Sequence, residues 1–108
     1  MRFNRRNWIR FFDGHNKKTT LRLKKSKLGH HKAYAGSYFK PEVLGEFDIV
    51  KVEERIFGKL TQQDAIEDGF DTLEELKDEL IKLNGKIADD IVIYQHLIEN
   101  MKDNGKED

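Results

Sequence analysis

The hydrophobic positions of the chain change from helical to alternating spacing near its N-terminus. Residues 4–13 carry three aromatic side chains on one helical face, and Asn4 stands at the N-cap position, so the pattern predicts a short helix. A polar loop then leads to residues 19–24, where apolar and polar residues alternate as in a half-buried strand. Leucines occupy one face of this strand, and the other face carries Thr20, Arg22 and Lys24.

Two more strands are expected in the middle of the chain. Residues 24–31 are rich in Lys and His and suit a basic loop. A strand is predicted over residues 33–39, and it ends before Pro41, which cannot donate a backbone hydrogen bond to a ladder. Residues 43–57 hold enough β-branched and aromatic side chains for another strand, in which Gly45 marks a candidate bulge.

Helical signals follow in the second half. Thr61 with Asp64, and Thr72 with Glu75, have the spacing of capping pairs, and a glycine follows each of the two predicted helices. Leucines form a stripe along the second helix. The acidic residues on its opposite, solvated face are Glu74, Glu75, Asp78 and Glu79. Residues 90–98 are dense in β-branched side chains, which favours a strand, although their apolar positions also fit a helical face. The sum is an α+β chain with an antiparallel, barrel-like sheet and about three helices.

The length of 108 residues suits one domain, which we place at residues 1–100, followed by a polar tail at residues 101–108. Hydrophobic and charged residues each make up 37% of the chain, and its eleven aromatic residues argue against disorder. Without cysteine there is no disulfide and no thiolate metal site, and no apolar run has membrane-spanning length. We expect a cytoplasmic monomer that uses no membrane, metal ion or cofactor.

Charge is distributed unevenly although the formal net charge is zero. Residues 1–34 contain eleven Lys and Arg and one acid, a charge of +10, whereas residues 35–108 contain nine Lys and Arg and nineteen acids, a charge of −10. A basic segment of this kind is typical of a surface that binds a polyanion such as RNA. Mutual neutralisation of the two segments in the fold is an equally good interpretation of the charges alone.

Two segments resemble the ASCH family of the PUA-like superfamily. The first is Lys17-Lys18-Thr19-Thr20-Leu21-Arg22, which is similar to the family pattern of a Lys, two residues, a Thr, one residue and an Arg at the entry to the first strand. The second runs over residues 60–70 and continues through Thr72-Leu73-Glu74-Glu75-Leu76. It is similar to the family's short helix, carboxylate-Gly-Phe turn and longer helix. With the order of elements, the resemblance covers nearly the whole chain.

The resemblance implies a PUA-like barrel with a cleft lined by the first segment, which binds RNA or a nucleoside in RNA metabolism. One bacterial branch of the family is similar to amidohydrolases that remove the acetyl group from N4-acetylcytidine through a Lys, a Thr and a Glu. Lys17 and Thr20 stand at the first two of these positions, and Asp68, which is one methylene shorter than Glu, stands at the third. A Lys of lowered pKa would accept the Thr hydroxyl proton in such a site.

Three hypotheses for the function follow. The first is RNA or nucleoside binding, for which the candidate residues are Lys18, Arg22, Lys24, Arg5, Arg6 and Tyr38. The second is an amidohydrolase that acts on a modified cytidine. The third is a protein-interaction module that uses the acidic helix over residues 72–84. Without the resemblance, Thr20 would be an ordinary strand threonine, the basic residues would form a solvated face, and Trp8 would pack in the core.

Overall fold

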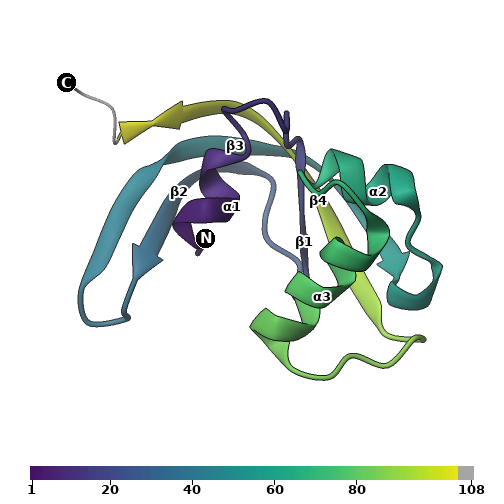
Figure 1. Ribbon diagram of the computed structural model, residues 1–108. Helices are drawn as coiled ribbons and strands as arrows, with labels where there is room; N and C mark the ends of the chain where they lie inside the picture. Colours follow the sequence, from purple (N-terminus) through teal and green to yellow (C-terminus); the bar gives the residue numbers. More distant parts are fainter. Residues whose placement is uncertain (105–108) are drawn as a thin grey trace.

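The computed structural model describes residues 1–104 and has the expected α+β composition (Figure 1). No helix in this part of the chain is both long enough and apolar enough to cross a membrane. The elements are α1 (Arg5–Ile9), β1 (Thr19–Arg22), β2 (Gly29–Gly36), β3 (Pro41–Ile56), the 3-10 helix η1 (Phe57–Lys59), α2 (Gln62–Glu67), α3 (Leu73–Asn84) and β4 (Val92–Asp103).

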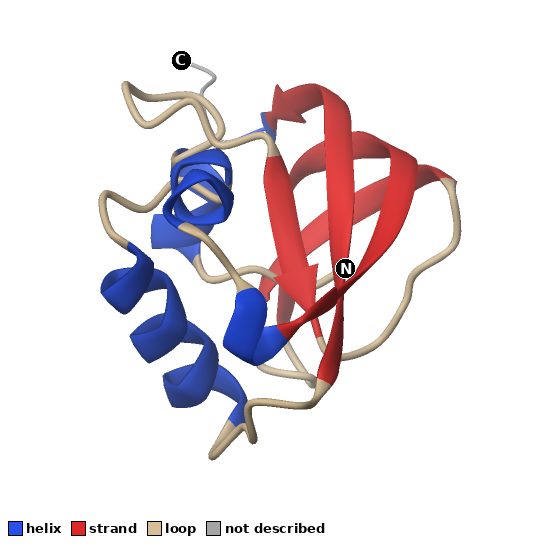
Figure 2. Cartoon of the chain, turned by 90° about the vertical axis from the view of Figure 1, so that its right-hand side faces the viewer, coloured by secondary structure: helices blue, strands red, loops and turns tan. Residues whose placement is uncertain are grey.

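The strands form one antiparallel sheet in the order β1-β4-β3-β2, which curls around α1 (Figures 1 and 2). β3 and β4 are the central strands, while β1 and β2 are its two edges. Within residues 1–104 no strand pairing joins these edges, so the expected closure into a barrel is not confirmed. The N-terminal segment instead runs along β2, where the Phe3 amide donates to the Tyr34 carbonyl at 2.8 Å.

A bulge beside Gly45 brings α1 against the sheet. The β2–β3 register shifts there, so that Leu44 has no partner on β2. A Cβ atom at Gly45 would lie 2.7 Å from Cζ2 of Trp8 and would also collide with the Lys102 carbonyl oxygen. The bulge that Gly45 indicated is therefore confirmed, and the glycine is needed because the Trp8 ring lies directly on the backbone.

The hydrophobic core has two parts that meet near β1. One contains aromatic residues of the N-terminal segment and α1, packed on β2, β3 and β4. Trp8 belongs to this part and is 1% exposed, so its interpretation as a core residue is confirmed. The other contains Leu21 of β1 together with apolar residues of η1, α2, α3 and β4. Figure 2 shows α2 and α3 on the same side of the sheet. The space between the two parts is a pocket lined by residues of both.

The predicted N-cap residues are confirmed at all three helices, but the capping box expected at Thr72 is only half formed, since Glu75 accepts from the Asp71 amide. Asn4 accepts from the Asn7 amide at 2.8 Å, and the Thr72 hydroxyl accepts from the Glu75 amide at 3.1 Å. Thr61 and Asp64 form a reciprocal capping box at α2. Gly69 and Gly85, which follow α2 and α3, both have positive φ.

Several expected boundaries were wrong. Residues 29–31, expected in a basic loop, begin β2, because they pair with residues 47–49 of β3. Pro41 does not end a strand but is the first residue of β3, a position where its missing donor costs nothing. Residues 101–103, expected in a polar tail, complete β4, since they pair with β3. Residues 105–108 of the expected tail lie outside the described residues.

Candidate functional site

The loop before β1 is tied to both neighbouring helical regions. The Lys17 amide donates to the Arg10 carbonyl at 2.8 Å, and the Lys18 amide donates to the Glu67 carbonyl, at the end of α2, at 2.7 Å. The Ile98 amide donates to the Lys18 carbonyl at 2.9 Å and so extends the pairing with β4. These three backbone bonds fix the path of the chain, and they direct the Lys17 side chain inward while Lys18 stays exposed.

Lys17 and Asp68 form a buried ion pair. Nζ of Lys17 lies 3.2 Å from Oδ2 of Asp68 and donates to the Asp68 backbone carbonyl at 2.9 Å. The two side chains are 2% and 6% exposed. Thr19 donates its hydroxyl to Oδ1 of Asp68 at 3.1 Å. Burial lowers the pKa of Lys17 and raises the pKa of Asp68, and the charge of each partner opposes the shift of the other.

Gly69 is what allows the buried pair to form. Its φ is 90°, and a Cβ atom there would lie 3.0 Å from Cβ of Lys17 and 3.2 Å from Cβ of Arg10. The Arg10 guanidinium donates to the Gly69 carbonyl at 2.8 Å and lies 4.7 Å from the centroid of the Phe70 ring. The positive φ and these close contacts favour glycine at position 69, where the turn after α2 approaches the β1 entry loop.

Thr20 and Arg22 lie on the same face of β1, as the alternation predicted. Nε of Arg22 donates to Oγ1 of Thr20 at 3.1 Å, and the guanidinium carbon lies 4.6 Å from the centroid of the Phe3 ring. Burial lowers the pKa of Arg22 to about 10, against the opposing effect of the Asp68 carboxylate. Arg22 therefore remains a cation at neutral pH, held between an aromatic ring and a hydroxyl group.

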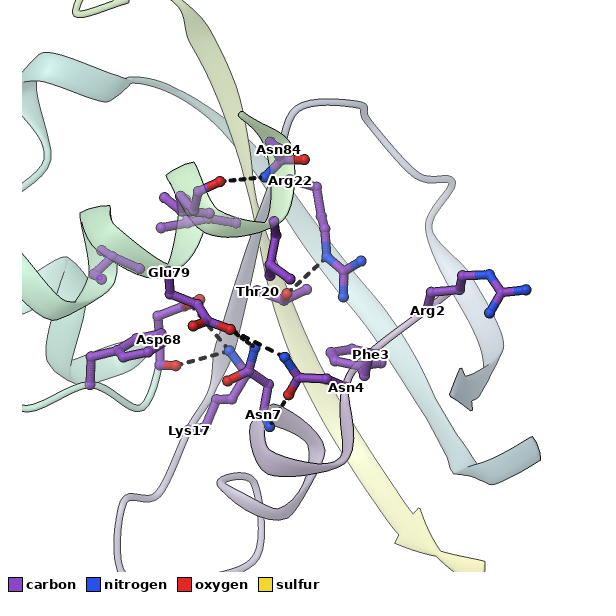
Figure 3. A pocket seen from close by; sticks show the side chains of 15 residues that line it. Arg2, Phe3, Asn4, Asn7, Lys17, Thr20, Arg22, Asp68, Glu79 and Asn84 are labelled. Atoms are coloured by element: carbon purple, nitrogen blue, oxygen red, sulfur yellow. Dashed lines mark hydrogen bonds and ion pairs between the residues drawn. The ribbon is translucent and has the colours of Figure 1, made fainter. Parts of the chain in front are cut away.

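These side chains line one pocket of about 430 Å³ between the two parts of the core (Figure 3). Polar groups come from the N-terminal segment, α1, the entry loop, β1 and the turn after α2, whereas α3 supplies an apolar wall of leucines together with two polar side chains. The lining residues are Arg2, Phe3, Asn4, Asn7, Lys17, Thr20, Leu21, Arg22, Asp68, Phe70, Leu76, Glu79, Leu80, Leu83 and Asn84. The volume and the mixture of apolar wall and few polar groups are typical of small-molecule sites.

Glu79 was wrongly assigned to the solvated face of α3, because it lines the pocket. Its Oε2 accepts from the side-chain amides of Asn4 at 3.2 Å and Asn7 at 3.1 Å (Figure 3). The sequence contained a signal for this position, since Glu79 follows Leu76 and precedes Leu83 at helical spacing. The pocket thus contains a second carboxylate besides Asp68.

The structure brings Lys17, Thr20, Asp68 and Arg22 together, but it places the other predicted binding residues elsewhere. Lys18 and Lys24 are exposed beside β1, and Tyr38 lies in the turn between β2 and β3. Arg5 forms an ion pair with Glu42, and Arg6 lines a second, shallow pocket together with acidic residues of α3. This arrangement on α1 favours mutual neutralisation of the basic and acidic segments there.

The histidines are accounted for by local contacts. Nε2 of His96 accepts from the Ser26 amide at 3.0 Å, so Nδ1 carries the proton that is donated to the Thr20 carbonyl at 3.2 Å. Burial lowers the pKa of His96, which favours this neutral form. His30 pairs with Glu46 and Asp48 on the surface. Among residues 1–104 no group of three or more metal-ligating side chains has a geometry that could hold an ion.

Comparison with known proteins identifies a fold. No family model matches the sequence, and no curated protein matches it in sequence. The chain is similar to the crystal structure of protein EF3133 from Enterococcus faecalis V583, a protein of the family model DUF984. The TM-score is 0.60 at 19% sequence identity, and the match covers 93% of this chain and 68% of that protein. At this level of identity the likeness shows a common fold.

Proposed function

We propose that this chain is an ASCH-type domain that binds RNA or a nucleoside and acts in RNA metabolism. The observation that carries the proposal is the convergence of Lys17, Thr20, Arg22 and Asp68 on one pocket from segments that are far apart in the sequence. The first three belong to the segment that resembles the ASCH pattern. The fold likeness to a DUF984 protein adds support, since DUF984 proteins are themselves ASCH-like.

The chemistry of the pocket suits a nucleobase with its sugar and phosphate. Leu80, Leu83 and Phe70 offer an apolar surface to the faces of a flat ring. The fork of Arg22 provides donors for a phosphate or a base carbonyl, and Glu79 provides an acceptor for an amino or hydroxyl group. A cationic donor and a carboxylate acceptor in the same pocket would therefore orient the ligand.

The proposal is tested by fluorescence anisotropy with a labelled single-stranded RNA, at low and at physiological salt. We expect binding that weakens as salt rises, because phosphates release counterions when Lys and Arg neutralise them. Arg22→Met should weaken binding about tenfold or more, which is the value of a lost charge-assisted hydrogen bond. Lys59→Met, which removes an exposed cation of η1 outside the pocket, is the matched control and should have little effect. Equal affinities of wild type and Arg22→Met would refute the assignment of the pocket.

The second candidate is an amidohydrolase that deacylates a modified cytidine such as N4-acetylcytidine. The buried Lys17–Asp68 pair beside Thr20 favours it, because burial lowers the pKa of Lys17 and so makes a neutral amine more accessible. In this reaction the Thr20 oxygen attacks the acyl carbon while its proton passes to the Lys17 amine. The C–N bond then breaks, Lys17 returns the proton to the departing base nitrogen, and water hydrolyses the acyl-threonine to the carboxylic acid.

The contacts of the pocket also define what this reaction would require. Nζ of Lys17 bonds to Asp68, and Oγ1 of Thr20 accepts from Arg22, so the substrate must draw Lys17 toward Thr20. The assay is release of cytidine from N4-acetylcytidine, followed by chromatography. Thr20→Val should abolish turnover and Thr20→Ser should retain it, because only the serine keeps a hydroxyl. Turnover that survives in Thr20→Val would rule out this mechanism.

A further inference from the structure

The turn between β2 and β3 presents two exposed aromatic side chains. Tyr38 is 83% exposed and Phe39 is 92% exposed, the largest fractions among the exposed large hydrophobic residues of the described chain. Their ring centroids are 6.0 Å apart with the planes at 90°, so the rings meet edge to face. The turn projects from the end of the molecule that α2 and α3 leave uncovered (Figure 1). Aromatic rings left in water in this way suggest a surface that binds a partner.

The backbone of this turn is held in place by two hydrogen bonds. The Lys40 amide donates to Oγ of Ser37 at 2.9 Å, and the Arg2 guanidinium donates to the Gly36 carbonyl at 2.7 Å. The aromatic pair therefore sits on a turn that is tied to the N-terminal segment. A surface fixed in this way loses little conformational entropy on binding.

Arg2 connects the aromatic turn to the pocket. It is one of the residues that line the pocket, and its guanidinium carbon lies 5.9 Å from the centroid of the Tyr38 ring. Figure 3 shows the Arg2 side chain beyond Phe3 and away from the Lys17–Asp68 pair. A guanidinium has five donors, so Arg2 can bind a phosphate while it keeps its bond to Gly36.

We propose that this protein binds single-stranded RNA through two neighbouring nucleotides, with one base in the pocket, the linking phosphate at Arg2 and the next base stacked on Tyr38 and Phe39. The inference rests on the proposed function, and it names the polynucleotide rather than the free nucleoside as the ligand. The order of groups along the surface is pocket, cation, aromatic pair, which matches the order base, phosphate, base along an RNA strand.

The charges around the turn favour RNA over other partners. Arg2 and Lys40 flank the aromatic pair, and residues 36–41 contain no acidic side chain. Base stacking on exposed aromatic rings beside cations is the usual mode of single-strand binding. An anionic lipid surface would also attract an aromatic and cationic turn, but it would make no use of the connection through Arg2 to an enclosed pocket.

The test compares a mononucleotide with a strand. Binding of cytidine 5′-monophosphate and of an unpaired RNA of about ten nucleotides is measured for wild type and for the double variant Tyr38→Ala/Phe39→Ala. Leu28→Ala is the matched control, since Leu28 is an exposed apolar residue away from the pocket. Circular dichroism of each variant confirms that the fold is retained.

We expect wild type to bind the strand more tightly than the mononucleotide. The double variant should lose about tenfold in affinity for the strand, from lost stacking, with a much smaller change for the mononucleotide. An unchanged affinity for the strand would overturn the inference and leave the proposed function intact. Vesicles of anionic phosphatidylserine serve as a third ligand. If the double variant lost binding to these vesicles but kept its affinity for the RNA strand, the inference would also be overturned. Failure of wild type to bind either nucleotide ligand would overturn the proposed function and the inference together.

Discussion

Removal of one partner from the Lys17–Asp68 pair should destabilise the protein far more than removal of both charges. Lys17→Met keeps the length of the side chain beside Gly69 but leaves the Asp68 carboxylate buried without a cation. Breaking a pair with side chains 2% and 6% exposed is expected to cost about 3–5 kcal/mol of unfolding free energy. Lys17→Met/Asp68→Asn removes both charges and keeps an acceptor for Thr19, so the double variant should be more stable than Lys17→Met.

Urea unfolding followed by the fluorescence of Trp8 measures these differences, because this residue is buried in the core. With an m-value of about 2 kcal/mol/M, Lys17→Met should lower the midpoint by about 1.5–2.5 M. Its cost should shrink as the pH falls from 7 toward about 4, because the buried carboxyl then takes up a proton. Lys51→Met, which breaks an exposed pair with Glu53, should change stability by less than about 0.5 kcal/mol.

A loss of stability in Lys17→Met as small as that in Lys51→Met would contradict a buried, unpaired carboxylate at Asp68. The same conclusion would follow if adding Asp68→Asn to Lys17→Met lowered stability further. Either result would mean that the carboxylate at position 68 reaches water or another cation in the folded protein, and that the pocket lacks the enclosed ion pair on which its chemistry depends.

Three further predictions concern single positions. Gly69→Ala should lower the free energy of unfolding in urea by about 1–3 kcal/mol, because Gly69 has a positive φ and contacts the entry loop. Gly14→Ala should leave this free energy nearly unchanged, because Gly14 has open space around it. His96→Gln should lose less stability than wild type between pH 7 and pH 5. Because burial puts the folded pKa of His96 below the unfolded value of about 6.5, wild-type stability falls as the unfolded state takes up the proton. Because Glu79 accepts hydrogen bonds, cytidine 5′-monophosphate should bind about tenfold more tightly than uridine 5′-monophosphate when the affinities are measured by calorimetry. Glu79→Leu should remove this preference. Equal binding of the two nucleotides by wild type would contradict this role of Glu79.

Local signals in the sequence predicted where the helices begin and where α2 and α3 end, although α1 ends at Ile9 and not at residue 13 as expected. Asn4, Thr61 and Thr72 each accept a backbone hydrogen bond within their own first turn, so the residues that form the cap are neighbours in the sequence. The positive φ of Gly69 and Gly85 likewise follows from the need to end a helix. The final strand was also predicted, because its β-branched residues outweighed the competing helical pattern.

Features set by long-range pairing were not predictable in the same way. Residues 29–31 look like a polar loop, and they form a strand only because β3 lies beside them. The open edges β1 and β2 depend on how far the sheet curls, which no local pattern encodes. For the site, the resemblance assigned Lys17 and Asp68 to one site, but the position of Glu79 in the pocket depends on how α3 packs beside α1.

In the proposed complex, the pocket between β1 and α3 receives a nucleotide of single-stranded RNA. Amide chemical-shift mapping with a short unpaired RNA locates the binding surface residue by residue. We expect the largest changes at Thr20, Arg22 and Asp68, with smaller ones at Tyr38 and Phe39. Changes confined to the exposed faces of α2 and β4, or saturating RNA with no change in the amides that border the pocket, would contradict this placement of the RNA.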